Sequence, residues 1–306
     1  MVQQKRLPKT KRAPEAIAPK RITERSLDVV RAIARYRFIP TSTLLRIVGG
    51  NEDVTHRHLQ HLYHAGVISR FTIPNTTHRG EFIYFLDNLI TIRELAPRLG
   101  IEVDWEQLRA NRERYSEEAL SDGSDGVGQF LFLRHELMIG DFRAALECAC
   151  RTSDGRVELA RWLQGPVLWS NVRVAPRRTL PHRPDALLAL RLPSAHEGQQ
   201  RANFFYEADR NTTALPRFKQ KVEAYIHHLK QRKHEALNIK RIRAVLVETT
   251  TDERIAALMT VVAAFAASEP LAGVLFWFAT AGKESDSPFS PRWVCAGDSR
   301  VRSLLD

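Results

Sequence analysis

Three acidic residues stand in two segments whose composition is typical of buried strands. Asp185 lies near the start of the segment RPDALLAL (183–190), and Glu207 and Asp209 lie near the end of the segment NFFYEADR (203–210). Both segments are apolar on both faces, as central strands are. Side chains alternate along a strand, so Glu207 and Asp209 share one face. Carboxylates among apolar side chains are costly unless they are paired or bind metal.

If the two strands are neighbours, Asp185, Glu207 and Asp209 are candidate ligands for a hard cation such as Mg²⁺. A metal held in this way can polarise a phosphate and activate an attacking water. The alternative is that these carboxylates only orient basic or hydroxyl groups nearby, with Arg210, Lys221 and Tyr225 as the candidates. Both interpretations stay open from the residues alone.

The surrounding sequence predicts the elements that would hold these residues. The expected order is a helix over 130–150, strands over 157–162, 183–190 and 203–210, a helix from 215, a strand over 242–247, a helix over 252–267 and a strand over 273–279. Strands that alternate with helices in this way predict an α/β domain with a mixed sheet.

The charge distribution indicates a polyanionic partner. The chain has 46 Lys and Arg residues against 35 Asp and Glu residues, a net charge of +11. The excess lies in two centres, residues 1–25 and 217–243, and nucleic acid is the partner that such an excess favours. We expect residues 1–22 to form a disordered basic arm whose DNA contacts include Lys9, Lys11 and Arg12.

Residues 101–128 are instead acidic and end in SDGSDGVG, which predicts an acidic helix followed by a flexible linker. The expected domains are therefore a DNA-binding domain over 23–100 and a second domain over 129–306. No apolar run approaches the about 18 residues that a membrane span needs. Three cysteines are too few for a disulfide framework, so we expect a cytoplasmic protein without a membrane partner.

Residues 23–100 show three helical segments followed by two strands joined by a polar loop. This order is typical of an α+β winged helix-turn-helix domain, and HLQHLYHAGVISRF resembles the third helix and first wing strand of that class. The side of the third helix opposite Leu59 and Leu62 would face DNA, and Arg79 in the wing loop would contact phosphate or the minor groove. The candidate reading residues on that side are His56, Arg57, Gln60 and His61. The alternative is a solvated helix face that contacts no DNA.

Five segments resemble the replication-relaxation family: LRHELMIGDF, HRPDALLAL, FFYEADRNT, KQKVEAY and RAVLVETTTDERIAAL. The resemblance covers roughly residues 25–295. It implies a winged helix joined to a restriction-endonuclease-like domain of the PD-(D/E)XK class, encoded on plasmids and integrated mobile elements.

The resemblance also assigns roles. Asp185 matches the motif aspartate and Glu207 the following acid, but Asp209 stands where the motif lysine is expected. Lys219 or Lys221 on the next helix would replace that lysine, and Lys221 fits the family's KxxxY pattern better. With Asp209 as a further ligand, Mg²⁺ is the implied cofactor only if the domain cleaves DNA.

The leading expectation is a DNA-binding protein of a plasmid or mobile element that regulates replication, transfer or transcription on double-stranded DNA. One alternative is a Mg²⁺-dependent endonuclease or nickase that uses Asp185, Glu207, Asp209 and Lys221. The other is an assembly factor whose second domain forms a homodimer or recruits a relaxase or replication protein. The sequence leaves open whether the protein is an enzyme.

Overall fold

The computed structural model describes residues 22–73, 80–115, 126–282 and 287–306. Its contacts cluster into two compact units, Met1–Asp141 and Phe142–Asp306. Helix α7 (Gly126–Arg151) begins in the first unit and ends in the second. No helix in the described part of the chain is long and apolar enough to cross a membrane.

The first unit is built mainly from short helices. They are α1 (Glu24–Tyr36), α2 (Thr41–Val48), α3 (Glu52–His64), α4 (Leu89–Leu99) and α5 (Trp105–Tyr115). Thr23, Asn51 and Asn88 each accept a hydrogen bond from a backbone N–H of the following helix. Such caps satisfy N–H groups that a helix leaves unpaired at its start. The three helices predicted over residues 23–64 are therefore present.

A small antiparallel sheet completes the first unit, with strand order β1 (Ile39–Pro40), β3 (Phe82–Phe85) and β2 (Ser69–Thr72). The sequence predicted β2 and β3 but not the two-residue β1. Phe38, Phe71 and Phe85 form an aromatic core with Tyr115 from α5. The helix that was predicted only as an acidic connector thus contributes to the core of this unit.

The second unit is built on a seven-stranded mixed sheet, which confirms the predicted mixed sheet. Its strands in spatial order are β12 (Asp298–Arg302), β11 (Trp293–Cys295), β10 (Phe276–Thr280), β9 (Ala244–Thr249), β8 (Arg201–Asp209), β7 (Ala186–Arg191) and β4 (Glu158–Gln164). The pairs β8–β9 and β9–β10 are parallel, and the other neighbours are antiparallel. All six residues of β9 are buried, as expected of a central strand.

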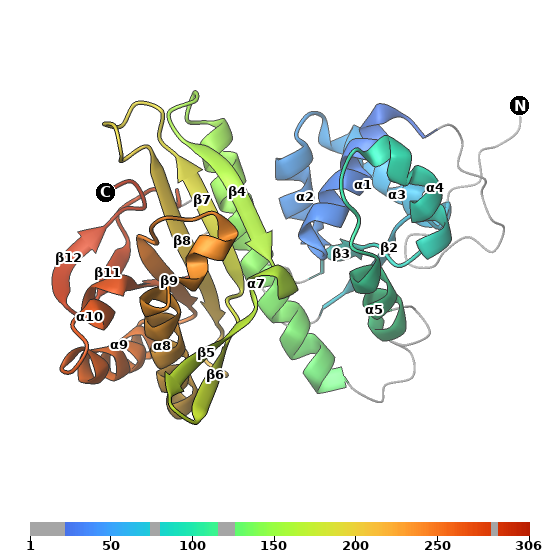
Figure 1. Ribbon diagram of the computed structural model, residues 1–306. Coiled ribbons are helices and arrows are strands. Elements are labelled where there is room, and N and C mark those ends of the chain that lie inside the picture. Colours follow the sequence, from blue (N-terminus) through green and yellow to red (C-terminus); the bar gives the residue numbers. More distant parts are fainter. Residues whose placement is uncertain (1–21, 74–79, 116–125, 283–286) are drawn as a thin grey trace, which may run out of the picture. The chain divides into compact units, whose positions relative to one another are not determined.

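Helices cover both faces of this sheet (Figure 1). On one face, Phe142 of α7 stacks on Tyr206 of β8, with ring centroids 4.3 Å apart. On the other face, α8 (Leu215–Lys230) and α9 (Asp252–Ala266) bury an apolar cluster that includes Phe205, Val222 and Leu258. Successive residues of β8 therefore face different helices.

Some elements of the second unit were not predicted. They are η1 (Pro166–Leu168), the hairpin of β5 (Ser170–Ala175) and β6 (Arg178–His182), η2 (Lys233–Leu237), α10 (Leu271–Leu275) and the β11–β12 hairpin. The strand predicted from residue 273 begins only at Phe276, because α10 occupies the preceding residues. Five consecutive apolar or small residues, LAGVL, do not distinguish a helix from a strand by periodicity.

Candidate functional site

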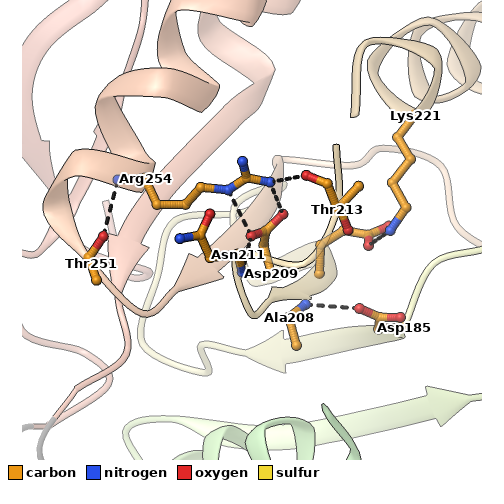
Figure 2. Close-up of polar contacts among 9 residues, drawn as sticks. Asp185, Ala208, Asp209, Asn211, Thr213, Lys221, Thr251 and Arg254 are labelled. Carbon is orange, nitrogen blue, oxygen red and sulfur yellow. Dashed lines mark hydrogen bonds and ion pairs between the residues drawn. The ribbon is translucent and has the colours of Figure 1, made fainter. Parts of the chain in front are cut away.

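Strands β7 and β8 bring two of the predicted site residues to the same level. The strands pair antiparallel with Ala186 opposite Tyr206, and Asp185 lies one residue before β7. An oxygen of Asp185 accepts a hydrogen bond from the backbone N–H of Ala208 at 2.9 Å (Figure 2). Asp185 therefore lies level with Glu207, as the prediction of neighbouring strands required.

Glu207 is 4% exposed and is bound by two residues of α8. The ammonium of Lys221 lies 2.5 Å from one carboxylate oxygen, and the hydroxyl of Tyr225 donates to the other at 2.6 Å. Lys221 and Tyr225 are four residues apart, a spacing that places both side chains on one helix face. The family's KxxxY pattern thus corresponds here to a paired cation and hydroxyl on a buried carboxylate.

Burial and the neighbouring charges act in opposite directions on both members of this pair. Burial raises the pKa of Glu207 to about 7, although the neighbouring Lys221 ammonium opposes that rise. Burial also acts to lower the pKa of Lys221, but the carboxylates of Glu207 and Asp185 outweigh it and raise that pKa above its ordinary value. Lys221 is therefore an ammonium ion near neutral pH, and it is the cation of this site.

Asp209 lies on the same face of β8 but binds a different helix. Arg254 of α9 donates to both of its oxygens, at 3.0 and 2.9 Å (Figure 2). The backbone N–H of Asn211 adds a third hydrogen bond at 2.8 Å, and Arg254 also donates to the carbonyl of Thr213. Asp209 is 6% exposed and Arg254 is 8% exposed, so this is a buried ion pair.

The three acids do not fit a Mg²⁺ ion. Magnesium needs oxygen ligands whose lone pairs face the metal in near-octahedral geometry. Both oxygens of Asp209 instead face Arg254, and those of Glu207 face Lys221 and Tyr225. Within the residues that the structure describes, no group of three or more His, Cys, Asp or Glu side chains is arranged to hold a metal ion. The magnesium site stays a prediction that this geometry does not support.

Another buried acid lies on the opposite face of the sheet and was not predicted from the sequence. Glu248 of β9 accepts a hydrogen bond from Tyr206 at 2.8 Å and pairs with Arg292 at 2.5 Å. It is 4% exposed. The sequence signal was the same as for Glu207: an acid inside an apolar strand, AVLVET. Its arginine follows 44 residues later, a separation that no local pattern reveals.

In the first unit, α3 presents its predicted DNA-reading residues on one side. Leu59 and Leu62 are buried, whereas His56 and Arg57 are exposed. Gln60 and His61 are partly buried on the same side. At 3.6 residues per turn these four residues span a continuous arc opposite Leu59 and Leu62. The predicted contacts Arg79, Lys9, Lys11 and Arg12 lie outside the described residues.

Arg25 is a basic residue near the N-terminus that has a structural role within the first unit. Arg25 belongs to the basic segment 1–25, but it lies in α1 and contacts the end of α2, the residue that follows it, and α3. Its guanidinium donates to the carbonyl of Val48 at 3.1 Å, to the carbonyl of Gly49, and to the hydroxyl of Thr55 at 2.8 Å. Arg25 therefore fixes the start of α3 from within the unit.

The two units thus combine a helical unit that carries a small antiparallel sheet with a mixed α/β unit that contains paired buried acids. The chain belongs to the replication-relaxation family, whose family model matches residues 30–240. The match spans the second half of α1 through η2, and it includes Asp185, Glu207, Asp209 and Lys221. No curated protein and no solved structure matches the chain.

Proposed function

We propose that this protein binds double-stranded DNA through α3 and acts in the replication or relaxation of a plasmid or integrated mobile element. Family membership supports the biological setting. Regulation of DNA transfer or of transcription at the same sites is consistent with this role. The excess of positive charge over the whole chain, +11, supports a polyanionic partner.

The observation that carries the proposal is the surface of α3. Asn51 caps the helix, Leu59 and Leu62 anchor it, and the opposite side presents Arg57 with His56. Helix α2 precedes it by a short turn, and β2 and β3 follow it. This order supports a winged helix-turn-helix, in which the second helix of the motif enters the major groove.

We infer that the second unit has a restriction-endonuclease-like fold that acts without metal-dependent cleavage. The order α7, β4, β7, β8, α8 and β9, with Asp185 and Glu207 on adjacent strands, supports the fold. The ion pairs of Lys221 and Arg254 support the loss of metal binding. The endonuclease or nickase is therefore the less favoured function.

The proposal is tested by selecting a preferred duplex from random DNA and comparing variants by fluorescence anisotropy. Arg57→Ala should weaken binding to the preferred duplex by about 1–3 kcal/mol and change binding to random duplex much less. Arg109→Ala on α5 removes the same charge from another exposed position and should leave the preference unchanged. An equal loss on both duplexes would make Arg57 a phosphate contact. No duplex binding at all would favour the assembly factor.

A further inference from the structure

A cavity of about 100 Å³ lies in the second unit between the end of β6 and α8. Its lining comes from three segments of the chain: the end of β6 with the residue after it, β8, and the first three turns of α8. Glu207 and Tyr225 lie along it, together with Lys221. Most of the exposed lining is apolar, so the few polar groups decide where a polar ligand can bind in the cavity.

His182 is a buried polar residue of the cavity lining whose ring nitrogens lack hydrogen-bond partners among the described residues. It is 1% exposed and lines the cavity, and neither of its ring nitrogens has a hydrogen-bond partner within the described chain. Its ring stacks on His228 at 3.9 Å between centroids and meets Tyr225 edge-on at 4.6 Å. A buried ring nitrogen without a partner costs about 1–3 kcal/mol, so such a group calls for a ligand or a water.

The charged groups around the cavity are mainly basic. Arg183 and Arg217 line it and are exposed, and neither forms an ion pair with any residue that the structure describes. Lys221 also lines it, and its side chain is 35% exposed. The one acid of the lining, Glu207, already has both oxygens bound by α8. An anion that enters the cavity would therefore meet more positive than negative charge.

An exposed aromatic side chain extends this basic surface. Trp169 is 50% exposed, and the guanidinium of Arg183 lies 5.0 Å from the centre of its ring. An exposed aromatic ring beside a cation is the combination on which proteins stack the bases of a nucleic-acid strand. Trp169 therefore favours a nucleotide unit over a bare anion.

We propose that this cavity binds a phosphate group of a nucleic-acid strand, with Arg183 and Arg217 contacting the phosphate and His182 hydrogen-bonding to it. Guanidinium groups match phosphate oxygens in two parallel hydrogen bonds. A neutral imidazole has one N–H to donate to a phosphate oxygen, and its other nitrogen accepts from a bound water. The site would give the protein a second nucleic-acid contact that does not depend on α3.

The first experiment measures phosphate binding by the full chain. Inorganic phosphate is titrated calorimetrically at low ionic strength into the parent protein, Arg183→Gln/Arg217→Gln and His182→Phe. Each variant should weaken binding by about tenfold or more. Arg201→Gln/Arg241→Gln removes the same two charges at exposed positions outside the cavity lining and should bind as the parent does. Absence of phosphate binding by the parent, or an equal loss in this control, would overturn the proposal.

The second experiment separates a nucleic-acid phosphate from a free one. Binding of a labelled single-stranded oligonucleotide is followed by anisotropy in the background of Arg57→Ala. Trp169→Ala should weaken oligonucleotide binding and leave inorganic phosphate binding unchanged, whereas Val167→Ala, a neighbouring exposed residue, should change neither. Phosphate binding without any effect of Trp169→Ala on the oligonucleotide would contradict the nucleic-acid assignment.

The two proposals fail in distinguishable ways. If α3 does not read DNA, Arg57→Ala leaves duplex preference intact, while phosphate binding still responds to Arg183 and Arg217. If the cavity does not bind phosphate, the duplex preference still depends on Arg57.

Discussion

Arg254 donates two hydrogen bonds to the carboxylate of Asp209. Asp209 stands at the position where the resemblance to the nuclease motif leads us to expect a lysine. Asp209 ends β8, and Arg254 lies in the first turn of α9. The positive charge of this site thus comes from two helices, through Lys221 of α8 and Arg254 of α9. Each buried carboxylate of β8 has a cation of its own, so charge balance here needs no metal.

The Arg254–Asp209 pair should be essential to the stability of the second unit. Arg254→Met leaves a buried carboxylate without its cation and should lower the free energy of unfolding by about 3–5 kcal/mol. Urea denaturation followed by circular dichroism measures this. Arg178→Met is the matched control, because Arg178 also donates two hydrogen bonds to a carboxylate, that of Glu223, but is half exposed. It should cost less than about 1 kcal/mol, and equal losses in both variants would contradict the argument.

The occupied carboxylates predict that the protein does not cleave DNA with a divalent metal. Plasmid and short duplexes that carry the preferred site are incubated with Mg²⁺ or Mn²⁺, beside Asp185→Asn and Lys221→Ala. No nicking by the parent, with the α3-dependent preference for the selected duplex retained by both variants, is the expected result. In a Mn²⁺ titration followed by electron paramagnetic resonance, Asp185→Asn should bind no less Mn²⁺ than the parent does. Nicking by the parent but by neither variant would restore the endonuclease.

The acids of this site and the two partners of Glu207 were predictable from the sequence, but the partner of Asp209 was not. Asp185 and Glu207 were visible because an acid inside an apolar strand is costly without a partner. Lys221 was found through a family pattern with short spacing. Arg254 was not found, because it lies 45 residues from Asp209 and appears in the sequence as an ordinary charge near the start of a helix. The chain topology decides which helix residue meets which strand residue, and local sequence patterns do not contain that information.

In the fold too, locally encoded elements were predictable from the sequence, and several others were not. Helices α1 and α3 were predictable because capping residues and apolar spacing are local signals. The hairpins β5–β6 and β11–β12 were missed, and with them His182, which ends β6 and lines the cavity. Pro181 lies next to His182 in β6, and the pair β5–β6 is a separate two-stranded sheet in which each strand is an edge. Proline is tolerated at such positions.

The basic N-terminal segment should contribute to DNA affinity through counterion release. Deletion of residues 1–22 removes seven Lys and Arg residues and one Glu. The slope of log affinity against log salt should become flatter between about 50 and 200 mM salt, because fewer phosphates are neutralised. Anisotropy titrations of the preferred duplex at several salt concentrations measure the slope. An unchanged slope would remove this segment from the interface.

His182 should make the stability of the second unit depend on pH. Burial, together with the nearby His228 and Lys221, lowers the pKa of His182 to about 2, so the folded protein holds this ring neutral. The unfolded chain protonates it below about pH 6.5. Because the unfolded state then binds the extra proton, the stabilisation is complete above pH 6.5 and is lost as the pH falls toward 2.

The pH effect is isolated by comparing variants. For one proton, the free energy of unfolding should fall by about 1.4 kcal/mol per pH unit below pH 6.5. His182→Phe removes this proton, so its stability should fall less steeply than that of the parent between pH 6 and 4.5. His196→Phe replaces an exposed histidine and should follow the parent curve. Urea denaturation at each pH gives the curves. Parallel curves for the parent and His182→Phe would show that His182 takes up its proton in the folded state, and that the buried ring has a charged partner.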